Sequence, residues 1–205
     1  MAGKRYLEGL RFGMLLQLAV GPMCLMVFNT AKNAGFWVAL SLVLSITLVD
    51  GFYIVLAALG ASKLLEKPSV KKAFRYIGGG VLLLFGLNTL LGAFGISLIP
   101  GADLQVDSAS VFLQGLLLTL SNPITIVFWG SVLTAKIVED DLKRKELTVF
   151  SLGLVSATLF FLSAIAGLGT VLSSFLPDGV SMALNILVGL LILFFGVKMM
   201  VKKGS

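Results

Sequence analysis

Two short motifs of this chain each place a proline among apolar residues: Val20-Gly21-Pro22-Met23-Cys24 and Ser121-Asn122-Pro123-Ile124-Thr125. Each motif lies inside an apolar run long enough to cross a bilayer, which takes about 20 residues. A proline inside a helix removes one backbone hydrogen bond and clashes with the preceding turn. The freed carbonyl group finds no water in hydrocarbon. We therefore expect two helices that break or kink near the middle of a membrane.

The composition of the whole chain favours a membrane protein. Of its 205 residues, 58% are hydrophobic and 13% are charged, whereas soluble domains average about 45–50% and about 25%. These values exclude an ordinary soluble domain and a disordered chain. Six continuous apolar runs are long enough to span a bilayer as helices. They cover residues 10–30, 35–58, 77–98, 111–133, 147–172 and 180–201.

The basic residues predict how these six helices are oriented. If the helices alternate in direction, all but one of the 16 lysines and arginines fall on the side that holds both termini, and only Lys32 falls on the other. Cytoplasmic loops carry such an excess of positive charge. We expect a multi-pass protein of the plasma (inner) membrane with both termini in the cytoplasm. The net charge of +6 then requires no nucleic-acid partner.

The chain also contains an internal repeat. Residues 79–86 and 189–196 both place two glycines seven positions apart around an aliphatic run that ends in phenylalanine. Together with the two proline motifs, this pattern predicts an all-α protein of two three-helix repeats, residues 1–100 and 101–205. Three is odd, so the second repeat is inverted in the membrane, as in many secondary transporters. Chance similarity between apolar helices is the alternative, and the matched prolines argue against it.

Asp50 is the one acidic residue deep inside a predicted span. An aspartate at the centre of a membrane helix costs about 2.5–3.5 kcal/mol, and no lysine, arginine or histidine lies at a similar depth. Either Asp50 carries a proton for part of the time, or it faces a wet cavity and meets a cationic ligand. Both describe the coupling or substrate site of a transporter. The alternative is a structural aspartate bonded to serine, threonine or backbone groups.

Other polar groups near the two prolines complete the predicted substrate site. Broken helices expose dipole ends and backbone groups that can hold a charged substrate. For each proline alone, a kink that only aids packing is the alternative. Other polar residues inside spans, such as Ser156 and Thr158, are expected to form hydrogen bonds between helices, and Trp37, Tyr76 and Trp129 to pack or to anchor the membrane interface. The predicted site consists of Asp50, Gly21, Pro22, Asn122, Pro123, Gln17, Asn88 and Thr125.

The residues that are absent exclude several functions. Histidine is absent and Cys24 is the single cysteine, so we expect no metal site and no internal disulfide. No phosphate-binding glycine loop occurs, so ATP is not expected to drive the protein directly. We find no nucleophile–base pair and expect neither an enzyme nor a cofactor. Gly9-x-x-x-Gly13 predicts a close contact between helices.

The chain resembles the lysine-exporter (LysE/RhtB) family of amino-acid efflux transporters. The likeness runs from Gly21-Pro22 through Ala31-Lys32-x-x-Gly35 and Asp50-x-x-Tyr53, and it returns in the Asn-Pro motif at residues 120–128. Val20 stands where the family commonly has the first proline of Pro-Gly-Pro. The resemblance implies export of amino acids or similar small solutes, driven by protons or by exchange. The alternatives are an exporter of another small ion or metabolite, a passive channel, and a non-transporting scaffold; the glycine-rich helices permit a homodimer.

Overall fold

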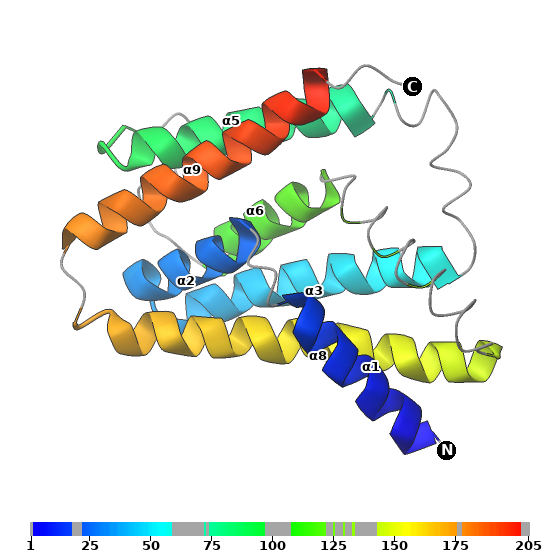
Figure 1. Ribbon diagram of the computed structural model, residues 1–205. Helices are drawn as coiled ribbons and strands as arrows, with labels where there is room; N and C mark the ends of the chain where they lie inside the picture. Colours follow the sequence, from blue (N-terminus) through cyan, green and yellow to red (C-terminus); the bar gives the residue numbers. More distant parts are fainter. Residues whose placement is uncertain are drawn as a thin grey trace.

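The computed structural model describes residues 2–17, 22–58, 72, 74–96, 108–121, 125, 129, 133, 143–175 and 178–201. All regular structure in these ranges is helical, which confirms the predicted all-α class (Figure 1). The helices are α1 (Ala2–Gln17), α2 (Pro22–Ala34), α3 (Phe36–Ala58), α5 (Gly79–Gly92), α6 (Ser108–Leu120), α8 (Arg144–Leu172) and α9 (Asp178–Val201). A π-helical turn, η2 (Phe74–Gly78), leads into α5.

Each of the six predicted spans contains at least one of these helices. α3 and α8 are long and apolar enough to cross a bilayer by themselves, and shorter apolar helices occur at Tyr76–Gly92, Ser108–Leu120 and Met182–Lys198. The first span holds two helices, because α1 ends at Gln17 and α2 begins at Pro22. α6 ends at Leu120, just before the second proline motif. Gly21, Asn122 and Pro123 lie outside the described residues, so the proline breaks stay predictions.

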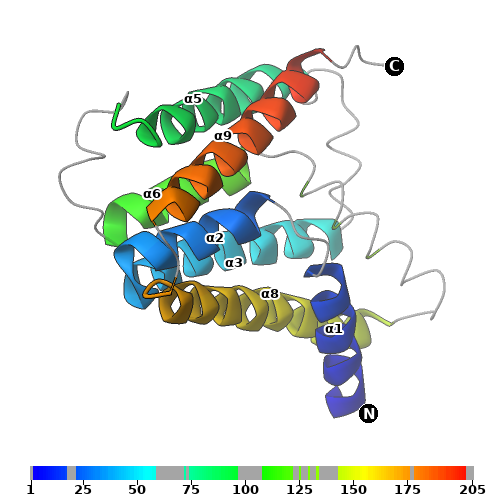
Figure 2. The same cartoon turned by 60° about the vertical axis from the view of Figure 1, so that its left-hand side comes forward.

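Small residues let α1 lie directly against α8. A Cβ atom added at Gly9 would lie 2.2 Å from the carbonyl oxygen of Phe150, and one at Gly13 would lie 2.5 Å from the Cβ of Ala157. From the other side, a Cβ at Gly153 would lie 2.4 Å from the carbonyl oxygen of Tyr6. The close contact predicted from Gly9-x-x-x-Gly13 is thus confirmed. α2 follows α8 further along, but α1 and α2 run in different directions (Figure 2).

Two pairs of facing glycines bring α5 against α9. A Cβ added at Gly86 would lie 3.2 Å from the carbonyl oxygen of Gly189, and one at Gly79 would lie 3.5 Å from that of Gly196. The earlier glycine of one helix therefore meets the later glycine of the other, so the two helices are antiparallel. They form a pair beside the group made by α2, α3, α6 and α8 (Figures 1 and 2).

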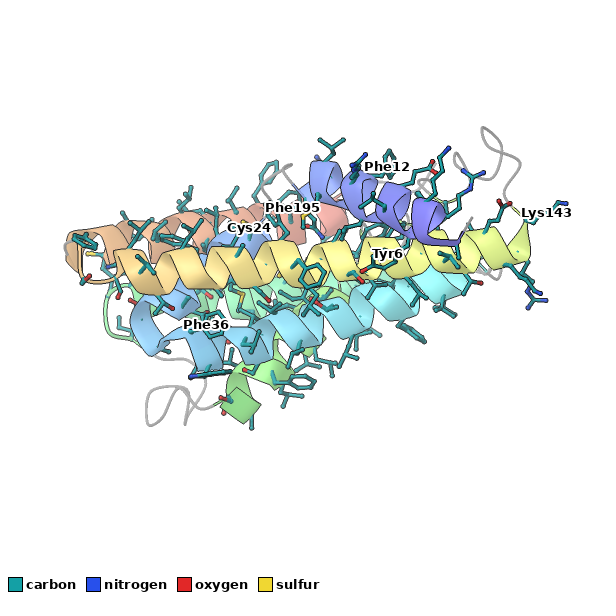
Figure 3. All side chains as sticks on the ribbon, turned by 90° about the horizontal axis from the view of Figure 1, so that it is seen from below. Tyr6, Phe12, Cys24, Phe36, Lys143 and Phe195 are labelled. Atoms are coloured by element: carbon teal, nitrogen blue, oxygen red, sulfur yellow. The ribbon has the colours of Figure 1, made fainter. Side chains whose placement is uncertain are left out.

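The outward surface of the helices is apolar. On α3, four large side chains recur three or four residues apart on one exposed face: Leu44, Leu48, Phe52 and Val55. Comparable side chains are exposed on α8 and α9, and side chains fill the spaces between the helices (Figure 3). Soluble proteins rarely expose so much contiguous apolar surface. Lipid chains in a bilayer would cover these faces, so the apolar side chains would not be exposed to water.

Candidate functional site

Asp50 lies near the middle of α3 and faces the interior of the bundle. Its side chain is 6% exposed, whereas the neighbouring Leu48 is 60% exposed. Val49, Tyr53 and Ile54 share the buried face. Residues two positions apart in a helix lie on roughly opposite faces. The carboxyl group of Asp50 and the exposed apolar face of α3 that includes Leu48 therefore point in different directions. The carboxyl group therefore faces protein rather than the outer surface.

Two hydrogen bonds join Asp50 to α8 and to α1. The hydroxyl group of Thr158 donates to Oδ2 of Asp50 at 3.3 Å. The Nε2 atom of Gln17 donates in turn to Oγ1 of Thr158 at 2.7 Å. Thr158 is completely buried, with an exposed fraction of 0%. Three helices that are distant in the sequence thus meet at one polar chain, which we call the Gln17–Thr158–Asp50 chain.

Two aromatic residues border this chain. The side chain of Trp129 is 2% exposed and lies close to the carboxyl group of Asp50. The hydroxyl group of Tyr53 donates to the carbonyl oxygen of Leu120 at 2.7 Å. Leu120 is the last residue of α6, where carbonyl groups lack partners within the helix. Tyr53 therefore ties the end of α6, beside the second proline motif, to the helix that bears Asp50.

The packing of α1 on α8 explains why Gln17 reaches Thr158. Both Gln17–Thr158 and Arg5–Glu146 join residues 141 positions apart, so α1 and α8 run in the same sense with a constant register. The Nε atom of Arg5 donates to Glu146 at 3.4 Å, and its Nη1 atom donates to Glu8 at 3.0 Å. The Glu8 carboxylate raises the pKa of the Arg5 guanidinium group. The charged end of α1 is thereby held at the start of α8.

The other predicted site residues are distributed as follows. Pro22 begins α2, and Thr125 is half-buried beyond the end of α6. Asn88 lies on α5, which packs chiefly against α9, so its role in the site stays a prediction. Gly21, Asn122 and Pro123 lie outside the described residues. Of the predicted set, the structure joins Gln17 to Asp50, through a threonine that sequence analysis assigned only to hydrogen bonding between helices.

Sequence reasoning missed Thr158 and Trp129 as members of the site. A threonine inside a span and a tryptophan beyond a proline motif were visible in the sequence, but both occur in many membrane helices for packing reasons. No local signal names Asp50 as their partner, because Thr158 is 108 residues away in the sequence. Among the described residues, no group of three histidine, cysteine, aspartate or glutamate side chains could hold a metal ion.

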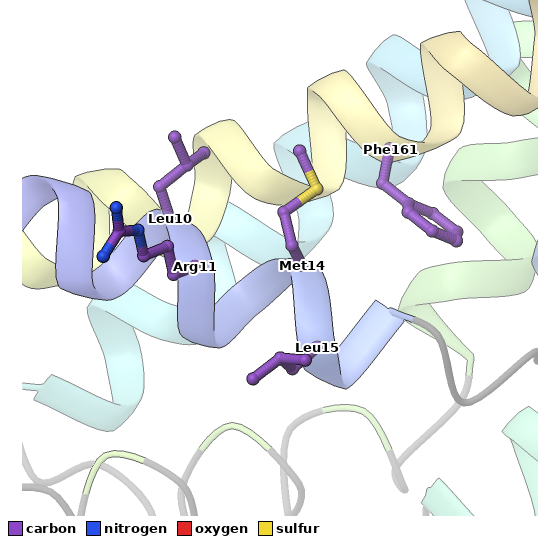
Figure 4. Close-up of a pocket in the computed structure, with 5 residues that line it drawn as sticks. All are labelled: Leu10, Arg11, Met14, Leu15 and Phe161. Carbon is purple, nitrogen blue, oxygen red and sulfur yellow. The ribbon is translucent and has the colours of Figure 1, made fainter.

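A separate groove of about 440 Å³ runs along the outer side of α1 (Figure 4). Its walls are almost entirely apolar, and none of them belongs to the Gln17–Thr158–Asp50 chain. The lining residues are Leu10, Arg11, Met14, Leu15 and Phe161. The groove therefore gives Asp50 no polar partner.

Comparisons with known proteins agree on one family. The family model described as LysE type translocator matches residues 14–203. Over 195 residues the chain is 27% identical to "Putative amino acid efflux protein YcgF" of Bacillus subtilis. The aligned region covers 93% of this chain and 92% of that protein. It is 29% identical over 148 residues to the threonine efflux protein of Escherichia coli K12. This second aligned region covers 70% of this chain and 72% of that protein. No solved structure gives a significant match.

Proposed function

The chain belongs to the LysE type translocator family of membrane transporters, and from that premise we propose that it exports amino acids through a site centred on Asp50. The family resemblance stated from the sequence is confirmed, and so is the expectation that the chain is not an enzyme, because the family consists of transporters. The observation that carries the proposal is a carboxyl group in the interior of the bundle whose described neighbours bear no positive charge.

An amino acid suits this site because it carries one ammonium and one carboxylate group. The Asp50 carboxylate attracts the ammonium group, and the carbonyl groups that end α6 at Leu120 add partial negative charge. The start of α2 at Pro22 presents amide groups with partial positive charge, which suit the substrate carboxylate. Breaks at Gly21-Pro22 and Asn122-Pro123 would bring both helix ends to mid-membrane. Two relatives are named as amino acid and threonine efflux proteins.

The helix packing supports two inverted repeats that move against each other. A twofold axis in the membrane plane makes equivalent helices antiparallel, which is the relation between α5 and α9 at their matching glycines. The same axis would relate the pairing of α1 with α8 to that of α6 with α3, and both pairings occur. Alternating access would then come from one repeat rocking against the other around Asp50.

Coupling to protons follows from competition at Asp50. A proton neutralises the charge that binds an ammonium group, so the carboxyl group holds one of the two at a time. In the predicted orientation, with both termini in the cytoplasm, a proton entering the cell would exchange for an amino acid leaving it.

Transport by the purified chain in liposomes tests this function. Under an imposed pH gradient, we expect wild type to move one or more members of a panel of labelled amino acids that includes L-threonine. Asp50→Asn keeps the shape but not the charge, and we expect it to lower the initial rate at least about tenfold. Glu8→Gln, at the charged end of α1, is the matched control and should transport like wild type.

Three results separate the alternatives. Solute flux that ignores the gradient would identify a channel, and the absence of flux for the whole panel would favour a scaffold. Wild-type rates and pH dependence in Asp50→Asn would refute the assigned role of the carboxyl group.

A further inference from the structure

Thr158 differs from the other hydrogen-bonded threonines of the described helices in its choice of acceptor. Thr47, Thr89, Thr148 and Thr170 each donate to the carbonyl oxygen four residues earlier in their own helix, at 2.8–3.0 Å. Thr170 also donates to the carbonyl oxygen of Ala31 on α2, at 3.5 Å. Thr158 instead donates to a carboxylate, that of Asp50 on α3. A carboxylate is a stronger acceptor than a carbonyl oxygen. By analogy with these threonines, the carbonyl oxygen of Leu154, four residues earlier, is the alternative acceptor for Thr158. We expect the charge on Asp50 to decide between the two acceptors.

Gln17 fixes the direction of this hydroxyl group. The amide nitrogen of Gln17 can only donate, so Oγ1 of Thr158 is the acceptor in their bond. The single proton of the hydroxyl group is then left for Asp50. If Asp50 gains a proton, its oxygens become weaker acceptors because the charge is lost, and the hydroxyl group turns to its own helix as the other threonines do. Oγ1 then moves away from Gln17.

We infer that Thr158 is a positioning residue that transmits the charge state of Asp50 to the end of α1. Gln17 is the last residue of α1, so its bond to Thr158 holds that helix end in place. Asp50 and Gln17 belong to the first predicted repeat and Thr158 to the second. A proton or an ammonium group arriving at Asp50 therefore alters both hydrogen bonds of this chain, each of which joins one predicted repeat to the other. The inference rests on the proposed function, and it states how a change of charge at Asp50 would move the end of α1.

The groups that face Asp50 leave few other sources of pH dependence. α1 contributes Gln17, α8 contributes Thr158, and Trp129 approaches from beyond α6; none of these three side chains is charged. Tyr53, on α3 itself, is the titratable neighbour among the described residues. Arg11 of α1 lines the outer groove instead.

Trp129 supplies a test that needs no substrate. The chain has two tryptophans, and Trp37 is exposed, so Trp37→Phe leaves Trp129, beside Asp50, as the single tryptophan, which can be excited apart from the tyrosines. We expect its fluorescence in the full chain, held in lipid nanodiscs, to titrate with pH. Asp50→Asn should abolish this titration. A titration that survives Asp50→Asn would show that another group is observed, and it would overturn the inference.

The decisive comparison uses three threonine variants in that background. Thr158→Val keeps the shape but removes the donor to the carboxylate, so the midpoint should move toward higher pH by about one unit. Thr158→Ser restores the hydroxyl group and should restore the midpoint. Thr119→Val is the matched control, because Thr119 is buried on α6 and its hydroxyl group has no hydrogen-bond partner. An unshifted midpoint in Thr158→Val, or an equal shift in Thr119→Val, would overturn the inference.

A variant of the partner residue completes the test. Gln17→Leu leaves the bond between Thr158 and Asp50 possible but removes the group that orients it. We expect a smaller shift in the same direction, and no shift would overturn the link to α1. The proposed function is tested separately, by the transport rate of Asp50→Asn. If Asp50→Asn loses transport but Thr158→Val leaves the midpoint of the fluorescence titration unshifted, the inference about Thr158 is refuted and the proposed function stands.

Discussion

Replacing Gly9 by alanine tests the close packing that brings α1 to the site. The new Cβ atom would lie 2.2 Å from the carbonyl oxygen and 3.0 Å from the carbonyl carbon of Phe150. Both are backbone atoms of α8, so no side-chain rotation relieves the contact. To open the shorter distance to about 3.0 Å, α1 must move away from α8 by about 0.8 Å. The hydrogen bond between Gln17 and Thr158, now 2.7 Å, would then lengthen by a similar amount and weaken.

The expected loss of stability follows from two opposing effects. Overpacking of this kind costs about 1–3 kcal/mol, and alanine is favoured over glycine in a helix by up to about 1 kcal/mol. Gly3→Ala, on the same helix, is the matched control, because a Cβ there meets no atom within 4 Å. The difference between the two variants isolates the packing cost of about 1–3 kcal/mol. For a chain of this size it corresponds to about 2–4 °C in Tm per kcal/mol.

Thermal unfolding in detergent, followed by fluorescence, measures this difference. We expect Gly9→Ala to melt several degrees below Gly3→Ala. The Trp129 titration of Gly9→Ala should also move toward higher pH, because Gln17 no longer orients Thr158. If Gly9→Ala melts at or above the temperature of Gly3→Ala, then α1 does not lie on α8 as described, and the position of Gln17 is wrong as well.

Two further predictions concern the end of α6 and the contact between α2 and α9. Tyr53→Phe removes the donor to the carbonyl oxygen of Leu120 and should cost about 1–3 kcal/mol in thermal unfolding; an unchanged Tm would show that this bond is dispensable. Asn29 on α2 donates to Asn185 on α9, so Asn185→Leu should free α2 and speed alkylation of the buried Cys24 about five- to tenfold. An unchanged alkylation rate would mean that other contacts hold α2 in place.

The helices themselves could be predicted from the sequence because their causes are local. A run of some 20 apolar residues must satisfy its backbone hydrogen bonds within the run when it enters a bilayer, so α3 and α8 follow from composition. The first span shows where local reasoning loses precision, since its continuous apolar run contains two described helices, α1 and α2. Helix ends depend on packing as much as on composition.

Asp50 could also be singled out from the sequence as a candidate site residue, because an acid in an apolar span is costly wherever it occurs. Its partners were not predictable. Thr158, Ser156 and Thr119 are equally polar residues inside spans, and the sequence does not distinguish them. Only the register of α1 and α8, set by glycines at their contact, brings Gln17 to Thr158 and both to Asp50.

The amino-acid sequence by itself determined the membrane class, the helical content and the acidic residue at the centre of the proposed site, since each reflects the free energy of placing particular groups in hydrocarbon. The tertiary structure alone decided that a threonine from α8 stands between Asp50 and the end of α1. The physical reason is that a hydrogen bond requires its atoms to approach within about 3 Å, and positions 108 and 141 residues apart acquire that proximity only when whole helices pack.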